Sequence, residues 1–276
     1  MASLSVPPVL TPPRDDAVAL HKAFKGFGCD STTQNAMLLW VLDPAGRDAT
    51  ILNQALNGDI TDLRTATEVI CSRTPSQLQI MKQTYRARFG CYLEHDITER
   101  TYGDHQKILL AYLGVPRNEG PEVDPSAVTN DARELYRAGE KRVGTDERAF
   151  IRIFTESSRA HLVSIANAYQ HMYARSLEKT LKSETTGNFQ FGLLTILRCA
   201  DTPAKYFAKV LHKAMKGLGT SNAALIRVAV TRTEVDMKYI KAEYHNKYKG
   251  SLAEAIHSET SGNYRTFLLS LVGRDR

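Results

Sequence analysis

The sequence has no long apolar run. Its longest mostly apolar stretches, such as 37–42 and 267–272, are far shorter than the roughly 20 residues that a helix needs to cross a bilayer. We therefore expect no transmembrane helix. The first residues, MASLSVPPVLTPPRDD, contain four prolines and no basic region ahead of an apolar core, so they do not have the pattern of a secretory signal. A cytoplasmic protein is expected.

Cysteine is scarce as well. The four cysteines, Cys29, Cys71, Cys91 and Cys199, lie far apart and form no CxxC pair. Zinc sites and disulfide frameworks depend on characteristic cysteine spacings. Neither is expected here, and we interpret the four residues as reduced thiols.

No dense run of one charge is present either. The formal net charge is +6, and the basic residues are dispersed, with small clusters at 137–142 and 238–249 that fit solvent-exposed helix faces. Aromatic residues do not alternate with basic ones in the pattern of a nucleic-acid-binding module, so we expect no nucleic-acid partner. The hydrophobic fraction of 42 % over 276 residues is enough for a substantial core.

What the sequence does contain is an internal repeat. A glycine loop, a tyrosine, an acidic Ser/Thr-rich segment and a Leu-Leu pair each reappear 75 residues later. The pairs are Gly144-Thr145 with Gly219-Thr220, Tyr169 with Tyr244, 183–189 with 258–264, and Leu193-Leu194 with Leu268-Leu269. Such a period indicates an array of similar units rather than one irregular core.

Two further copies are weaker. One occupies about 48–114 and closes with Leu109-Leu110. The other begins at Ala17, where AVALHKAFKGFGCD matches AKVLHKAMKGLGTS from Ala208, and passes within a few residues to a closing Leu38-Leu39 pair. The first unit therefore keeps its beginning and its end but lacks its middle.

The apolar spacing inside each unit is helical. Apolar residues recur at steps of three and four, for example over 206–215, and strand-like alternation is absent. Ser221 or Asn222 and Thr145 with Asp146 are positioned to begin helices. About five short helices fit each full unit, which predicts an all-α chain. The Pro/Gly-rich segment 114–125 is interpreted as a linker that splits the array into two halves.

The loop at 215–220, Met-Lys-Gly-Leu-Gly-Thr, has the composition of a cation site. Glycines permit backbone angles that turn carbonyl oxygens outward, and calcium takes about six to eight oxygen ligands in flexible geometry. Glu259, 40 residues after Gly219, is the candidate carboxylate. Carbonyls, one bidentate carboxylate and water would complete a calcium site that could also bind lipid phosphate oxygens.

These features together resemble the annexin family, and its plant members in particular. The K-G-x-G-T loop, its acidic partner and the unit length carry the resemblance, which covers residues 15–273. It implies an all-α array of four five-helix repeats, the first of them truncated. The implied organisation is a flexible tail at 1–14, repeat I at 15–42, repeat II at 43–114, a linker at 115–128, repeat III at 129–200 and repeat IV at 201–276.

The resemblance also implies which residues hold calcium. In repeat IV the ligands are the carbonyls of Met215, Gly217 and Gly219 and the side chain of Glu259. In repeat III they are Glu140, Arg142, Gly144 and Glu184, where Arg142 stands in place of a glycine and would contribute only its carbonyl; whether this site binds is left open. In repeat I they are Phe24, Gly26 and Gly28.

Repeats I and II are expected to bind calcium poorly. In repeat I, Cys29 replaces the loop threonine and the acidic partner falls in the missing segment. Repeat II has the loop 57–62 without a glycine pair. A repeat without its middle helices also leaves the apolar faces of its neighbours uncovered, which predicts self-association or reduced stability.

Calcium-dependent binding to anionic phospholipid membranes is the expected function. Ca²⁺ would bridge backbone carbonyls and lipid headgroups, while dispersed basic residues add attraction to the anionic leaflet. A cytoplasmic protein would then become peripheral at membranes when calcium rises, in a plant stress response. The alternatives are a nucleotide-hydrolysing or calcium-channel-like activity, or a defective splice form with weak membrane binding.

Three motifs suggest other roles. Residues 151–153, Ile-Arg-Ile, resemble a proposed contact with F-actin, although helix core positions explain them equally well. Asp43 to Gly46 and the glycines of 139–145 suggest nucleotide binding, but the Gly-Lys-Ser/Thr ending and the preceding strand of a phosphate loop are absent. No Ser-His-Asp or paired-carboxylate arrangement is apparent, so we do not expect an enzyme and assign no catalytic residue.

Overall fold

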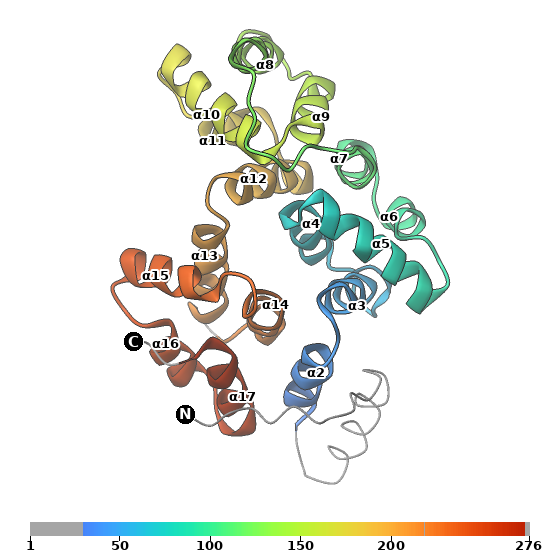
Figure 1. The fold of residues 1–276 in the computed structure, drawn as a ribbon, viewed down its shortest axis with the longest axis vertical. Helices are drawn as coiled ribbons and strands as arrows, with labels where there is room; N and C mark the ends of the chain where they lie inside the picture. Colours follow the sequence, from blue (N-terminus) through green and yellow to red (C-terminus); the bar gives the residue numbers. More distant parts are fainter. Residues whose placement is uncertain (1–29, 218, 274–276) are drawn as a thin grey trace. The chain divides into compact units, whose positions relative to one another are not determined.

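The computed structural model describes residues 30–217 and 219–273. Within these ranges the regular secondary structure consists of sixteen α-helices, α2 to α17, and no strand (Figure 1), which confirms the all-α prediction. The chain divides into two units. One contains residues 48–207, and the other contains the described residues before 48 and after 207.

Among the described residues of the first repeat, one helix, α2 (Ser31–Trp40), precedes three groups of five helices. The first group is α3 (Pro44–Asn57), α4 (Leu63–Ser72), α5 (Pro75–Phe89), α6 (Leu93–Arg100) and α7 (Gly103–Gly114). The second is α8 (Pro125–Ala138), α9 (Glu147–Glu156), α10 (Arg159–Tyr173), α11 (Leu177–Glu184) and α12 (Gly187–Asp201). The third is α13 (Pro203–Met215), α14 (Asn222–Arg232), α15 (Met237–Tyr248), α16 (Leu252–Glu259) and α17 (Gly262–Val272). Five helices per full repeat agree with the prediction.

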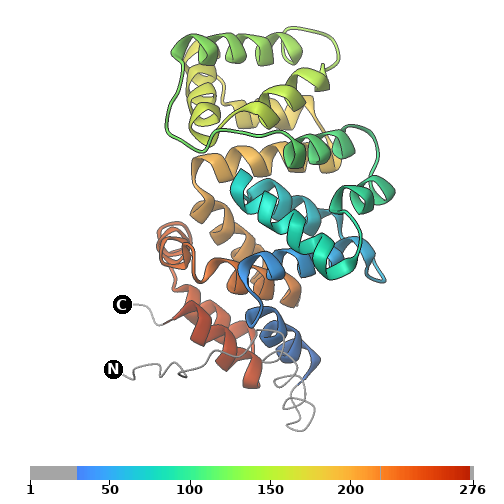
Figure 2. The same ribbon diagram turned by 45° about the vertical axis from the view of Figure 1, so that its right-hand side comes forward.

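The expectation that the linker splits the array into halves is wrong. Residues 48–207, which include the second and third repeats and the linker between them, form one unit. Helices α4 and α12 pack side by side at the centre of this unit (Figure 2), and α7 packs on α9. The approach of α12 is close at Gly192, where an added Cβ would lie 3.5 Å from Thr67 and 3.9 Å from Cys71. Packing of apolar helix faces, rather than chain connectivity, therefore decides which repeats belong together.

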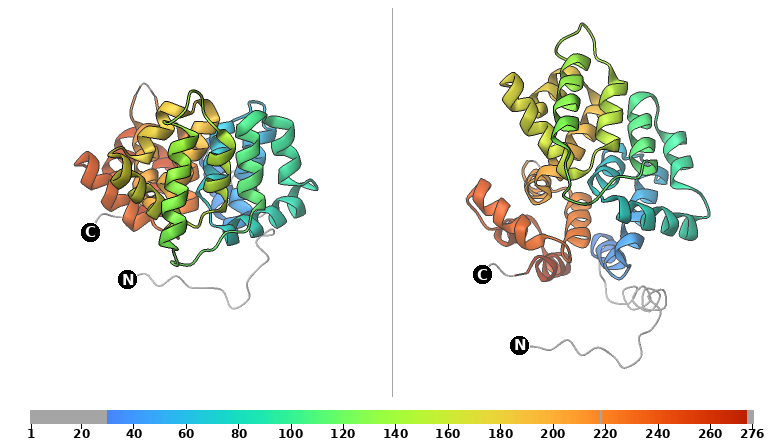
Figure 3. Two further views of the ribbon diagram at one scale, coloured as in Figure 1. Left: turned by 90° about the horizontal axis from the view of Figure 1, so that it is seen from above. Right: turned by 45° about the horizontal axis from the view of Figure 1, so that its top comes forward.

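The linker is also shorter than predicted. An extended segment follows α7 (Figure 3), but α8 begins at Pro125, inside the range assigned to the linker. The local reason is visible in the sequence. Asp124 accepts a hydrogen bond from the Ser126 N–H at 2.9 Å as the N-cap, and Pro125 occupies the first helical position, where its missing N–H costs nothing.

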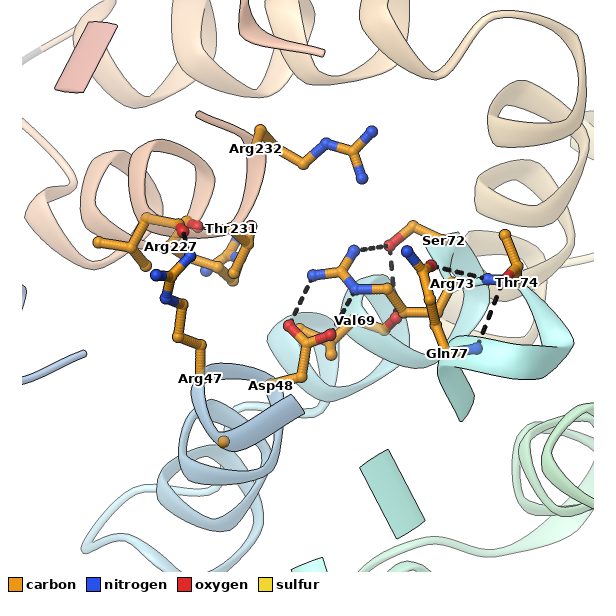
Figure 4. Close-up of polar contacts among 12 residues, drawn as sticks. Arg47, Asp48, Val69, Ser72, Arg73, Thr74, Gln77, Arg227, Thr231 and Arg232 are labelled. Carbon is orange, nitrogen blue, oxygen red and sulfur yellow. Dashed lines mark hydrogen bonds and ion pairs between the residues drawn. The ribbon is translucent and has the colours of Figure 1, made fainter. Parts of the chain in front are cut away.

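Local polar contacts fix the helices around α4 (Figure 4). Asp48 of α3 pairs with Arg73 through two hydrogen bonds of 2.6 and 2.7 Å, and both side chains are buried. Thr74 and Gln77 form a reciprocal capping box at the start of α5. The buried charges of Asp48 and Arg73 are tolerated because the guanidinium and the carboxylate are hydrogen-bonded to each other.

The smaller unit shows what becomes of the shortened first repeat. Helix α2 packs on α14 and α17 of the fourth repeat and buries Ala36 and Leu39. At the start of α3, Arg47 donates hydrogen bonds of 2.9 Å to the carbonyls of Trp40 and Val230. Helix α2 of repeat I is thus anchored to repeat IV. Self-association through uncovered apolar surface stays a prediction.

Candidate calcium loops

The same backbone conformation recurs in each full repeat, at the point where its fourth helix ends. Helices α6, α11 and α16 each span eight residues and are each followed by a threonine and, two residues further on, by a glycine. The threonine hydroxyls donate to the carbonyls four residues earlier at 2.5 to 2.6 Å, and the threonine φ angles are −131°, −132° and −131°. The glycine φ angles are 62°, 63° and 58°. The last helical residue therefore occupies the same local position in each repeat.

That shared position holds Arg100 in repeat II, Glu184 in repeat III and Glu259 in repeat IV. Glu259 was predicted from its spacing and Glu184 from the family resemblance, whereas Arg100 was not predicted to occupy an equivalent position. The sequence does contain a signal for Arg100, because the threonine and the glycine that follow each helix align Arg100 with the two glutamates. A cation cannot be held by a guanidinium, which carries only donors. Repeat II thus lacks the carboxylate as well as the glycine pair.

The loop of repeat IV has the backbone that the calcium prediction needs. The Ser221 N–H donates to the Ala214 carbonyl at 2.8 Å and closes the loop between α13 and α14. Gly217 and Gly219 have φ angles of 137° and 91°, which residues with a Cβ rarely adopt. Met215 is the last residue of α13, so no N–H of a following helical turn donates to its carbonyl.

The carboxylate of repeat IV lies against this loop. The Thr220 hydroxyl donates to Oε2 of Glu259 at 3.0 Å, and both residues are at the protein surface. Residues from two separate helical connections, about 40 apart in sequence, are therefore brought together. In the described ranges no three His, Cys, Asp or Glu residues gather as metal ligands. A cation at this place would thus draw on backbone carbonyls and one carboxylate, which is oxygen chemistry that suits calcium.

Repeat III brings its predicted residues together in a different way. The Thr145 hydroxyl donates to the backbone carbonyl of Glu184 at 2.8 Å, and Gly144 has a φ of 79°. The Glu184 side chain lies against Gly139, where an added Cβ would be 3.0 Å from its Cγ. Arg142 is not among the residues of positive φ, whereas Gly217 at the equivalent place is. The two loops therefore follow different backbone paths.

The side chain of Glu140 is committed to the protein interior. It accepts hydrogen bonds from the Tyr169 hydroxyl and, at 3.0 Å, from Thr180, and it pairs with Arg175 at 2.9 Å. Burial raises the pKa of Tyr169, and its hydrogen bond to Glu140 adds to the shift. Only the Glu140 carbonyl thus remains for a cation.

Repeat II uses the corresponding interior position for a closed polar network. Asp96 accepts hydrogen bonds from Tyr85 at 2.5 Å and from Asn57 at 2.7 Å. Burial acts to raise the pKa of Asp96, but the hydrogen bonds from Tyr85, Asn57 and Cys91 together hold that pKa below its ordinary value. The Asp96 carboxylate is therefore occupied by hydrogen bonds that hold the end of α3 to α5, and it is not free to bind an ion at the surface.

Two loops expose a large apolar side chain. Val143 in repeat III is completely exposed, and Ile60 in repeat II is 85 % exposed. Leaving such side chains in water forgoes the benefit of burial. The predicted repeat I ligands Phe24, Gly26 and Gly28 lie outside the described residues.

The weaker motifs have structural roles. Asp43 accepts a hydrogen bond of 2.8 Å from the Gly46 N–H at the start of α3. Arg152 of the Ile-Arg-Ile triplet pairs with Glu134 at 2.7 Å, and Ile153 is buried. None of the described helices has the length and apolar character of a membrane span.

Comparison with known proteins agrees with this geometry. A family model described as Annexin matches residues 47–112, 130–196 and 206–271. Annexin D5 of Arabidopsis thaliana is 43 % identical over 313 aligned positions, which cover 99 % of each chain. The structure of annexin III has a TM-score of 0.89 at 29 % identity, with 99 % of this chain and 97 % of that chain covered. A calcium-bound annexin (Sm)1 has a TM-score of 0.80 at 23 % identity, over 95 % and 90 % of the two chains, and so shows the fold alone.

Five-helix repeats whose loops meet a residue at the end of a neighbouring helix define a class of calcium-dependent membrane-binding repeat proteins. The chain belongs to the annexin family and is of the plant type. Annexins bind acidic phospholipids with Ca²⁺ as the cofactor and are not classical enzymes. The matched segments are the three full repeats, and the shortened first repeat lies outside them.

Proposed function

We propose that the loop of repeat IV is the principal calcium site through which this annexin binds anionic membranes. The carbonyls of Met215, Gly217 and Gly219 and the carboxylate of Glu259 would hold the ion. The observation that carries this proposal is the 3.0 Å contact between Thr220 and Glu259, because it brings the acidic partner predicted from its spacing onto the glycine loop. Calcium supplies the positive charge that attracts lipid phosphates, and the protein supplies a preformed oxygen cage.

Repeat III is proposed as the auxiliary membrane contact. Its ligands would be the carbonyls of Glu140, Arg142 and Gly144 and the side chain of Glu184. The exposed Val143 at the loop tip would enter the acyl boundary once an ion has drawn the loop to the headgroups, since burying an apolar side chain of this size contributes about 1.5–3 kcal/mol. The positive charge of Arg142, about half exposed, adds attraction to an anionic leaflet.

In a cell, this arrangement makes membrane association follow the calcium concentration. The protein is proposed to be cytoplasmic at resting calcium and peripheral at membranes when calcium rises. Removal of calcium with a chelator releases it, because the loops then present backbone carbonyls and carboxylates, which phosphate groups do not bind.

Co-sedimentation with phosphatidylserine vesicles over a calcium series tests the proposal. The wild-type protein is compared with Glu259→Gln and with the matched control Glu254→Gln. Glu254 is an exposed acid in the first turn of the same helix, so it controls for the loss of one negative charge. We expect Glu259→Gln to need about tenfold or more calcium for half-maximal binding, because the loss of a charged ligand costs about 1.5–3 kcal/mol.

The control variant Glu254→Gln should bind like the wild type. Equal weakening of both variants would show that net charge, rather than ligation, governs binding. Unchanged binding of Glu259→Gln would remove repeat IV from the mechanism.

A further inference from the structure

A groove of about 1010 Å³ lies in the smaller unit, along α15 of repeat IV. The start of α16 and the end of α17 line its other side. The residues that α15 and its C-cap contribute recur at steps of three and four, as neighbours on one helix face do; they are Lys238, Lys241, Ala242, His245, Asn246 and Lys249. From Lys238 to Lys249 the chain rises about 16 Å, which is the length of a short peptide.

The α15 side of this groove is basic. Among the described residues that line the groove, three are lysines, Lys238, Lys241 and Lys249, and one is acidic, Glu254. Lys238 and Lys249 are exposed to solvent. The lining therefore has a net positive charge, which attracts an anionic partner. These lysines form the basic cluster at 238–249 that the sequence contains and that the calcium site does not use.

The acidic residues at the start of α15 are engaged by arginines instead. Glu234 pairs with Arg47 at 2.5 Å, and Asp236 pairs with Arg232 at 2.5 Å. Because a carboxylate held by a guanidinium is already neutralised by its partner, these two acids leave the positive charge of the groove in place.

One lysine of the groove has a structural role. Lys241 donates to the Gly273 carbonyl at 3.2 Å, beyond the end of α17. Lys82 of repeat II donates in the same way to the Leu113 carbonyl at 3.5 Å, at the end of α7. Lys241 is therefore explained by the fold of the repeat, and the argument for a partner depends on Lys238 and Lys249.

The fold of the repeat requires neither Lys238 nor Lys249. The residues at the same places in repeats II and III are Gln79 and Val163 for Lys238, and Gly90 and Ala174 for Lys249. The C-cap residue has a positive φ in all three repeats, 74°, 53° and 60°. Glycine suits that backbone conformation best, so lysine at position 249 gives no conformational benefit. Both basic side chains are peculiar to repeat IV.

Large apolar side chains are exposed beside this basic face. Val235 is 55 % exposed and Tyr239 is 65 % exposed. Tyr239 precedes Ala242 of the groove by three residues, so the two are neighbours on the surface of α15. A partner that lies along α15 would therefore cover an aromatic ring as well as contact lysines, and aromatic residues are enriched at the centres of protein interfaces.

We propose that this groove binds an acidic amphipathic peptide segment of a protein partner, whose carboxylates face Lys238 and Lys249 and whose apolar side chains cover Tyr239. Such a segment, bound as a helix, presents side chains four residues apart at a spacing of about 6 Å. The basic positions of α15 have the same spacing. Binding of an amphipathic helix in a groove is a common mode of peptide recognition.

The shape and charge of the surface favour a peptide over other anionic partners. A lipid leaflet presents a broad surface that does not enter a groove. Nucleic acids gain much of their affinity from many phosphate contacts, for which three lysines opposed by one glutamate are few. The peptide site needs no calcium, so it does not depend on the proposed membrane mechanism.

Fluorescence anisotropy of a labelled peptide, titrated with the full chain in a calcium chelator, tests the proposal. The probe is a helical peptide of about twelve residues with a glutamate at every fourth position and leucines beside them. The control probe carries glutamine in place of each glutamate. The double variant Lys238→Gln with Lys249→Gln is compared with the matched control Lys213→Gln with Lys247→Gln, which removes two exposed lysines of the same repeat outside the groove.

We expect the acidic probe to bind the wild type and the control double variant equally. It should bind the Lys238 and Lys249 double variant about fivefold or more weakly, because each exposed ion pair contributes modestly. Tyr239→Ser should weaken binding about threefold through the loss of apolar contact. Arginine at positions 238 and 249 keeps both charges and should preserve binding.

Several results would overturn the proposal. The wild type could show no binding of the acidic probe at protein concentrations up to millimolar, or it could bind the glutamine probe equally well. Equal weakening in the two double variants would show general charge attraction. Tighter binding of a uridine oligonucleotide or of phosphatidylserine vesicles in chelator, lost with Lys238 and Lys249, would assign the surface to a nucleic acid or a membrane. Thermal unfolding of each variant identifies any that has lost its fold, and the arginine variant then decides the outcome.

Discussion

The loops of repeats II and IV share one backbone frame and carry opposite chemistry. In both, an eight-residue helix ends in a charged residue that is followed by a threonine and then a glycine of positive φ. The charged residue is Arg100 in repeat II and Glu259 in repeat IV. The frame is therefore maintained by helix ends and hydrogen bonds that do not depend on calcium. Ligand chemistry is set by one side chain and by the glycines of the facing loop.

Repeat III is intermediate between these two. It keeps the glutamate at the end of the helix, but its loop has one glycine of positive φ where repeat IV has two. From this comparison we predict that calcium affinity falls in the order of repeats IV, III and II.

The strongest test places the residue of repeat II into repeat IV. In Glu259→Arg the guanidinium meets the carbonyls of the glycine loop, and no carboxylate remains to hold an ion. We expect calcium-dependent vesicle binding to fall at least as far as in Glu259→Gln, with the thermal midpoint nearly unchanged because residue 259 is exposed. Vesicle sedimentation and circular dichroism measure the two quantities. Wild-type calcium dependence in this variant would contradict the ranking.

The glycine loop of repeat IV is tested by Gly219→Ala. Nothing lies within 4 Å of an added Cβ, but the φ of 91° strains any residue that has one. We expect a loss of about 1–2 kcal/mol in the free energy of unfolding, together with weaker calcium binding. Urea unfolding with and without calcium measures both effects. Gly250→Ala is the control, because that position has open space and no positive φ, and it should be nearly neutral.

A pH effect should arise from a buried histidine of repeat II. His105 of α7 is buried, lies 2.8 Å from the Thr67 hydroxyl, and has its pKa lowered to about 4 by burial. The unfolded chain, with an ordinary histidine pKa of about 6.5, binds more protons between these values, so stability falls as the pH drops from about 6.5 towards 4. The equivalent residues, Phe189 and Tyr264, do not titrate there.

His105→Phe should remove part of this acid sensitivity. Thermal midpoints between pH 5 and 6.5, about the range above ordinary carboxylate titration, isolate the histidine contribution. The exposed His95→Gln variant serves as the control and should keep the wild-type slope. The same slope in His105→Phe would show that the acid sensitivity arises elsewhere.

The smallest effect is expected for the reverse exchange, Arg100→Glu. It restores the carboxylate of repeat II, but none of residues 57–62 has a positive φ, so the loop lacks the backbone that turns carbonyls outward. We expect less than about a tenfold gain in calcium affinity at this repeat. Calcium titration calorimetry measures it, and a complete additional high-affinity site would show that the carboxylate alone makes the site.

Much of the fold could be predicted from the sequence because the repeat multiplies weak local signals. Helix starts at Asn222 and Glu147 followed from polar N-cap residues. The pairing of repeats could not be predicted, since it depends on the contact between α4 and α12 at Gly192, far apart in the chain.

The candidate calcium residues could be predicted from the sequence to different degrees. Spacing alone paired Glu259 with its loop, since both lie at the ends of helices that recur in each repeat. The different backbone path at Arg142 could not be predicted from the sequence, because the effect of replacing a glycine depends on how the loop rearranges. An alignment of the helix ends alone would have predicted the position of Arg100, which the pattern of glycine pairs does not include.

The central claim is that repeat IV holds calcium through its glycine loop and Glu259 while repeat II does not. A crystal structure of the full chain grown with calcium tests this most directly. The account predicts an ion bound by the carbonyls of Met215, Gly217 and Gly219 and by both oxygens of Glu259, with none beside Arg100. An ion in the loop of repeat II, or a repeat IV loop without one at saturating calcium, would contradict it.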